Sequence, residues 1–158
     1  MRLFLAGTEA PSPLPLSLQR FIDKFFLMKF IFKNGETIRV MYYFDLLKEF
    51  HTVGIKYMIA GGLSVNLHGI PRVTQDIDIV ISPDRENILL TVSVLKKLGF
   101  VPVLPVNPED LADESIRESW IREKNMVAFS FHHTTDNYRV IDIILVHPLD
   151  LDSAYLNR

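Results

Sequence analysis

The sequence contains no cysteine among its 158 residues. This absence excludes disulfide bonds and thiolate zinc sites, and it is typical of proteins from a reducing cytosol. No apolar run approaches the roughly 20 residues of a membrane span. The apolar N-terminus is interrupted at Gly7 and is too short for a secretory signal. We therefore expect a cytoplasmic protein without a membrane partner.

The formal net charge is only −2, since 17 lysines and arginines stand against 19 aspartates and glutamates. A chain without an overall excess of positive charge is not expected to bind nucleic acids non-specifically. The hydrophobic fraction of 48% is ordinary for a globular protein. We expect a single domain over residues 28–158. Residues 1–27 are expected to form an N-terminal extension that is partly helical or disordered, and Met28 is an alternative start site.

The chain is organised around the stretch from Tyr57 to Ser82, where Gly61-Gly62 separates two strand-like runs and the second run carries Asp76 and Asp78. In a strand, residues two apart point to the same face, with Cα atoms roughly 6.5 Å apart. Two such carboxylates can share a divalent cation. Their aliphatic neighbours predict a strand deep in a sheet, where a carboxylate needs a metal or hydrogen bonds. The alternatives are a position at the strand mouth for Asp76 and a buried arginine partner for Asp78.

A third acidic residue, Asp142, lies alone in the aliphatic strand-like run from Arg139 to Leu145. A strand of branched aliphatic residues does not tolerate a lone charge without compensation. Two strands that each bury a carboxylate are therefore expected to meet. We predict that Asp142 joins Asp76 and Asp78 around one metal site.

Gly61-Gly62 follows a strand and precedes a predicted helix. Glycine there allows the backbone to approach a ligand closely, and a helix N-terminus offers free N–H groups to a phosphate. A tight strand-to-helix turn is the alternative. No Lys-Ser/Thr follows, which excludes a Walker A loop. Arg72 is suited equally to phosphate binding and to a surface loop, and Thr74 is either a ligand-side hydroxyl or a strand-forming residue.

Hydrophobic periodicity predicts strands and helices over most of the chain. Asn34-Gly35 suits a type I′ turn and predicts a hairpin over 29–40 with a return strand at 37–40. His132 and His133 are adjacent in a predicted strand, so we expect them to face opposite sides beside a turn. Further strands are expected at 55–60, 75–81, 100–104, 126–132 and 138–146, the last two joined by a turn at 133–137, and helices at 17–27, 42–53, 61–68, 83–98 and 109–123.

These motifs resemble the signature of the polymerase-β-like nucleotidyltransferase superfamily. The resemblance covers about residues 43–147 and is carried, in order, by Gly61-Gly62-Leu63-Ser64, Asp76-Ile77-Asp78-Ile79 and Ile141-Asp142-Ile143. The string from 61 to 78 is most similar to small prokaryotic members, which include nucleotidyltransferases related to abortive-infection and toxin–antitoxin systems. The resemblance implies an α/β (α+β) fold, with a mixed β-sheet flanked by helices.

The same resemblance implies roles for individual residues. Asp76, Asp78 and Asp142 would be the catalytic residues and would bind Mg²⁺ or Mn²⁺, with Asp142 also acting as or assisting the base. The nucleotide-binding residues implied are Gly61, Gly62, Ser64 and Arg72.

The leading hypothesis is a metal-dependent nucleotidyltransferase that moves an NMP from an NTP to a hydroxyl of an RNA, a protein or a small molecule and releases pyrophosphate. The alternative is a non-catalytic nucleotide-binding or antitoxin-like module of the same fold. Many relatives continue into a helical domain that binds the acceptor, whereas here only residues 147–158 follow. We expect a homodimer or a partner protein, because the apolar stretch at 17–32 exceeds what one small core needs.

Overall fold

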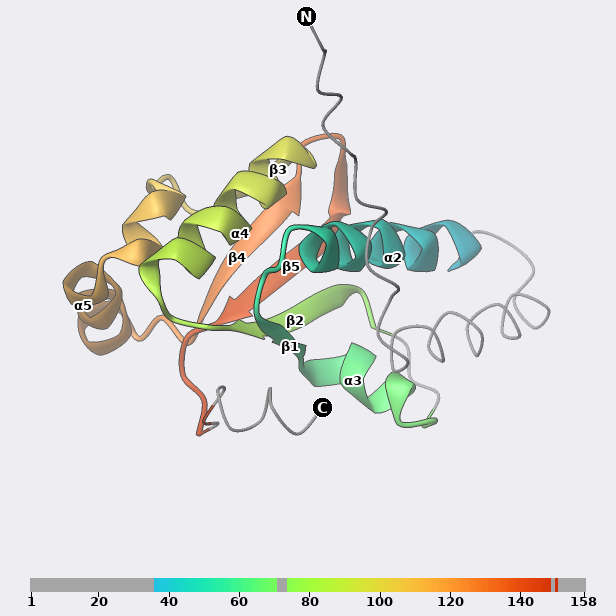
Figure 1. Ribbon diagram of the computed structural model, residues 1–158, viewed down its shortest axis with the longest axis horizontal. Helices are drawn as coiled ribbons and strands as arrows, with labels where there is room; N and C mark the ends of the chain where they lie inside the picture. Colours follow the sequence, from blue (N-terminus) through green and yellow to red (C-terminus); the bar gives the residue numbers. More distant parts are fainter. Residues whose placement is uncertain (1–35, 71–73, 149, 151–158) are drawn as a thin grey trace, which may run out of the picture.

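The structure is a computed structural model that describes residues 36–70, 74–148 and 150. The extension predicted at 1–27, the apolar stretch at 17–32 and most of the predicted hairpin at 29–40 lie outside these residues. Within the part described, a five-stranded mixed sheet is combined with helices (Figure 1). The predicted α+β fold with a mixed sheet is therefore confirmed.

The strands lie in the order β1-β2-β5-β4-β3. Strands β2 and β5 pair in parallel, and the other three neighbouring pairs are antiparallel. Strand β5 is thus central, although among the described strands it is the last in the sequence (Figure 1). The strands are β1 (Tyr57–Ile59), β2 (Asp76–Ile81), β3 (Phe100–Pro102), β4 (Ala128–His133) and β5 (Asp136–Ile144).

One face of the sheet forms the hydrophobic core. It is built from alternate residues of the three central strands, each at most 2% exposed, because successive side chains in a strand point to opposite faces. Burying each of these side chains contributes roughly 1.5–3 kcal/mol to the free energy of unfolding. Helices α2 (Glu36–Thr52) and α4 (Arg85–Lys97) cover this face (Figure 1). The side chains are Ile77, Ile79, Phe129, Phe131, Ile141 and Ile143.

Helix α2 runs from Glu36 to Thr52. The prediction of a return strand at 37–40 was therefore wrong, while the helix predicted at 42–53 is confirmed with an earlier start. The stretch contains neither glycine nor proline, and two-residue alternation over only four residues is too short to oppose a longer helical period. The helix is held by its buried inner side, which comprises Tyr43, Leu46, Leu47 and Phe50.

Helix α4 (Arg85–Lys97) lies where the sequence predicted it. Its buried side chains Ile88, Val92 and Leu95 are four and three residues apart, the spacing of one helix face. The helix begins at Asp84, whose side chain accepts a hydrogen bond from the Asn87 N–H. This N-cap satisfies a backbone donor that the helix itself leaves without a partner.

The single helix predicted at 109–123 is two elements: the 3₁₀-helix η1 (Pro108–Ala112) and helix α5 (Glu114–Lys124). The break falls at Asp113, whose backbone is extended and whose carboxylate accepts hydrogen bonds from the N–H groups of Ser115 and Ile116. An N-cap residue has non-helical backbone angles, so a helix begins there and does not continue through it.

The hairpin predicted from two C-terminal strands is confirmed as β4 and β5, but its turn is tighter than predicted. Only Thr134 and Thr135 separate the strands, in place of the expected 133–137. A register shift between His132 and His133 accompanies this turn. The carboxylate of Asp136, the first residue of β5, accepts a hydrogen bond from the Tyr138 N–H at the start of the second strand of the hairpin.

Helix α3 (Gly61–Leu67) follows β1 directly and contacts β2. Figure 1 shows it on the side of the sheet away from α4. It confirms the short helix predicted between the two strands of the organising stretch. Because the preceding residue, Ala60, donates its N–H to the carbonyl of Asp78, α3 begins beside the middle of β2.

The Asp84 cap gives a first prediction. Partial burial disfavours the ionised carboxyl, but hydrogen bonds from the Asn87 N–H and the Ser82 hydroxyl, together with the charge of Lys56, lower its pKa overall. Asp84→Ala should lower the free energy of unfolding by about 1 kcal/mol at neutral pH, as measured by urea unfolding.

The pH dependence follows from the direction of the shift. A carboxyl with a lowered folded-state pKa stabilises the protein above its unfolded-state pKa, and this stabilisation is lost as the pH falls through the folded-state value. Asp84→Asn is the matched control, because an amide still caps the helix but does not titrate. It should keep most of the stability at neutral pH and lose this acid-dependent contribution. Equal losses for the alanine and asparagine variants would contradict the capping role.

Candidate metal centre

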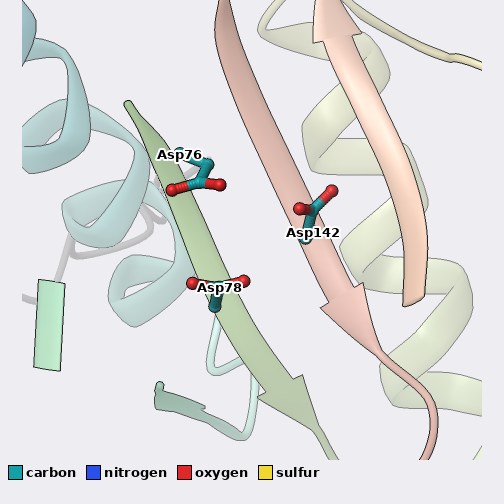
Figure 2. Close-up of side chains that lie close together, drawn as sticks. All are labelled: Asp76, Asp78 and Asp142. Carbon is teal, nitrogen blue, oxygen red and sulfur yellow. The ribbon is translucent and has the colours of Figure 1, made fainter. Parts of the chain in front are cut away.

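The three predicted aspartates lie together on one face of the sheet. Asp76 and Asp78 are two residues apart on β2, and Asp78 is directly opposite Asp142 in the parallel pairing with β5. Figure 2 shows all three carboxylates on the same side of the two strands. One carboxylate oxygen from each residue lies within 4.8 Å of those from the other two. The predicted meeting of Asp142 with Asp76 and Asp78 is confirmed.

Because side chains alternate along a strand, the three carboxylates lie on the face opposite the core. Ile77 and Ile79 are fully buried on the opposite face, whereas the three aspartates are half-buried. The carboxylates are therefore accessible to a ligand yet held on a rigid part of the sheet. A one-residue shift of either strand would exchange the two faces.

Asp142 has an unsatisfied oxygen. Within the described residues, its Oδ1 is buried and accepts no hydrogen bond, and no ion pair involves Asp142. A buried polar atom without a partner is unfavourable, and a charged one is more so. A cation bound by this oxygen would remove that penalty.

Repulsion among the three carboxylates also favours the binding of a cation. Two like charges about 4 Å apart repel by roughly 4 kcal/mol at an effective dielectric constant of about 20. A divalent cation among the three aspartates would replace repulsion with attraction, and carboxylate oxygens are the ligands that hard cations such as Mg²⁺ prefer. The donor set and the unsatisfied oxygen of Asp142 both fit a divalent metal ion.

Gly61, the first residue of α3, packs against this site. Its φ of +56° lies in the left-handed region, and a Cβ atom there would overlap the carboxylate of Asp78. Only glycine fits both the backbone angle and the space. The turn at Gly61 therefore brings the start of α3 into contact with Asp78 of the aspartate triad.

The other predicted nucleotide-binding residues are Gly62, Ser64 and Arg72. Gly62 is buried, and Ser64 is half-buried, with its N–H donated to the carbonyl of Ala60. The Ser64 hydroxyl is thus the group of this residue that a phosphate could engage. Arg72 lies outside the described residues.

Residues of β4 extend the same face; the sequence prediction did not single out Ser130, and it placed His132 beside a turn and not at the site. Ser130 is directly opposite Asp142, and His132 is opposite Val140, so both side chains share the face of the aspartates. Combining the predicted hairpin with strand alternation would have identified them. His133 faces the other way and packs edge-on against Phe100, with ring centroids 5.2 Å apart. The prediction that the two histidines face opposite sides is confirmed.

No protein-family model, curated protein or solved structure matches this chain. Among the described residues, no helix has the length and apolar character that crossing a membrane requires.

Gly61→Ala provides a direct test of the packing beside the candidate metal centre. The added methyl group would force the Asp78 carboxylate to turn away, so we expect Mn²⁺ affinity, measured by isothermal titration calorimetry, to fall by roughly 10–100-fold. The left-handed backbone should also lower stability by about 1–3 kcal/mol.

Gly54→Ala is the matched control. Gly54 also has a positive φ, at +79°, but a Cβ there would contact nothing within 4 Å. It should show a similar backbone penalty with parental Mn²⁺ affinity. Equal Mn²⁺ affinities for both alanine variants would show that Gly61 does not shape the site.

The charge cluster itself gives a further prediction. Mn²⁺ should raise the free energy of unfolding by RT ln(1 + [L]/Kd), or about 2.7 kcal/mol at a concentration 100 times Kd. Asp142→Asn should abolish most of this gain, because it removes one ligand charge. Without metal, the variant should be at least as stable as the parent, because one source of repulsion is gone. Urea unfolding with EDTA or Mn²⁺ measures both effects.

Asp45→Asn is the control for that measurement, since Asp45 is an exposed carboxylate on α2. It should leave the Mn²⁺-dependent gain unchanged. If the Asp142→Asn variant retained the full gain, the metal would have to bind elsewhere.

Proposed function

We propose that this protein is a Mg²⁺-dependent nucleotidyltransferase that transfers an NMP from an NTP to a hydroxyl acceptor. The observation that carries the proposal is the convergence of Asp76, Asp78 and Asp142 on one accessible sheet face. The sequence resemblance of the same motifs supports this assignment.

The chemistry requires stabilisation of negative charge. The acceptor oxygen attacks the α-phosphorus, the bond between this phosphorus and the bridging α–β oxygen breaks, and pyrophosphate leaves. Divalent metal ions held by the three aspartates would stabilise the charge on the attacking and leaving oxygens. With its buried Oδ1 on the metal ion, Asp142 would also act as or assist the base that accepts the proton of the acceptor hydroxyl.

The arrangement of the strands suggests a direction for each substrate. Helix α3, with Gly61, Gly62 and Ser64, follows β1 on one side of the aspartates, and β4 lies on the other. We assign the NTP phosphates to the α3 side. The acceptor then approaches Asp142 over β4, where Ser130 and His132 share its face. An RNA, a protein or a small molecule could supply the hydroxyl, and a second copy of this chain or a partner protein would complete the acceptor surface.

The decisive experiment uses NTPs labelled at the α-phosphate, with Mg²⁺ and cell extract as the source of acceptor. The parent protein should transfer label to an acceptor, and nuclease or protease treatment of the product identifies its class. Asp78→Asn and Asp142→Asn should reduce transfer by roughly 100-fold or more, the scale on which losing one charge-stabilising group slows a reaction. Asp45→Asn should leave the rate unchanged.

Two other outcomes are informative. NTP binding in equilibrium dialysis without any transfer would replace the enzyme with a nucleotide-binding or antitoxin-like module. The absence of both transfer and NTP binding would overturn the proposal.

A further inference from the structure

Asp76 receives a hydrogen bond from a hydroxyl outside the triad. The Oγ1 atom of Thr74 lies 2.9 Å from Asp76 Oδ1 and 3.1 Å from the Asp76 carbonyl oxygen. Thr74 is half-buried and precedes β2 by two residues. Its hydroxyl therefore touches one of the three groups that define the metal centre.

The hydroxyl has one proton to donate, and the carboxylate is both the closer and the charged acceptor. Donation to Oδ1 restricts rotation of the Asp76 side chain. It also satisfies one oxygen of the carboxylate while leaving lone pairs for a metal ion. A hydrogen bond of this kind orients a ligand before the metal arrives.

Asp76 is the member of the triad with the greatest need for such a contact. It is the first residue of β2, whereas Asp78 lies inside the strand and is confined by Gly61. Asp142 lies within β5, between β2 on one side and β4 on the other. The rigidity that the sheet gives to those two residues is reduced at a strand end, where Thr74 can replace it.

We propose that Thr74 is a positioning residue of the metal centre, which holds the Asp76 carboxylate in the orientation that binds a divalent cation. This inference rests on the proposed function, since it assigns the role of a residue around the same site. A purely structural role, in which the hydroxyl serves only the Asp76 carbonyl at the start of β2, predicts a different result.

The test compares Thr74→Val with Thr74→Ser. Valine keeps the shape but removes the hydroxyl, so Mn²⁺ affinity in isothermal titration calorimetry should fall by roughly 10–100-fold, the usual effect of losing a contact that orients a metal ligand. Serine keeps the hydroxyl and should restore most of the affinity. Thr52→Val is the matched control, because the Thr52 hydroxyl donates to the carbonyl of Lys48 at the end of α2. It should bind Mn²⁺ like the parent.

Urea unfolding in EDTA separates the two roles. A positioning role predicts weaker Mn²⁺ binding by Thr74→Val under conditions where the variant is fully folded. Parental affinity combined with reduced stability would overturn the inference and leave a strand-entry hydrogen bond. If the parent bound Mn²⁺ and transferred label but Thr74→Val retained its affinity, only this inference would fail. A parent that did not bind Mn²⁺ would overturn both this inference and the proposed metal centre.

Discussion

The parallel pairing of β2 with β5 is the constraint on which the rest of the site depends. This register sets Asp78 opposite Asp142 and, on the other face, pairs Ile77 with Ile141 and Ile79 with Ile143. The same pairing therefore forms the hydrophobic core and gathers the carboxylates. Because side chains alternate, the register that buries the isoleucines is also the one that aligns the aspartates. Core packing thus holds the three aspartates in fixed positions relative to one another.

Local patterns in the sequence were sufficient for much of the fold and for the identity of the triad. Asp76 and Asp78 could be predicted to share a face because strand alternation depends only on neighbouring residues. Helix α4 could be predicted from its apolar spacing and its Asp84 cap. The meeting with Asp142 was a longer inference, and it succeeded because isolated charges in aliphatic strands need compensation.

The errors have physical reasons. Residues 37–40 alternate like a strand, but they belong to a helix whose buried side further along, including Leu46 and Phe50, determines the conformation. Asp113 divides η1 from α5 because its side chain caps a new helix. Apolar periodicity alone does not predict such a cap. The contact between Thr74 and Asp76 depends on the path of the chain into β2, which residue spacing alone does not specify.

The central position of β5 has a consequence for protein synthesis. The sheet is incomplete until β5 inserts between β2 and β4, which leave the ribosome before it. The contacts of β5 with β2 join residues more than sixty positions apart, and such distant pairings form late and slowly. A nascent or truncated chain that ends before Asp142 therefore presents only two of the three carboxylates. Cation binding at the triad would then require a chain that extends through Asp142 and has β5 paired with β2.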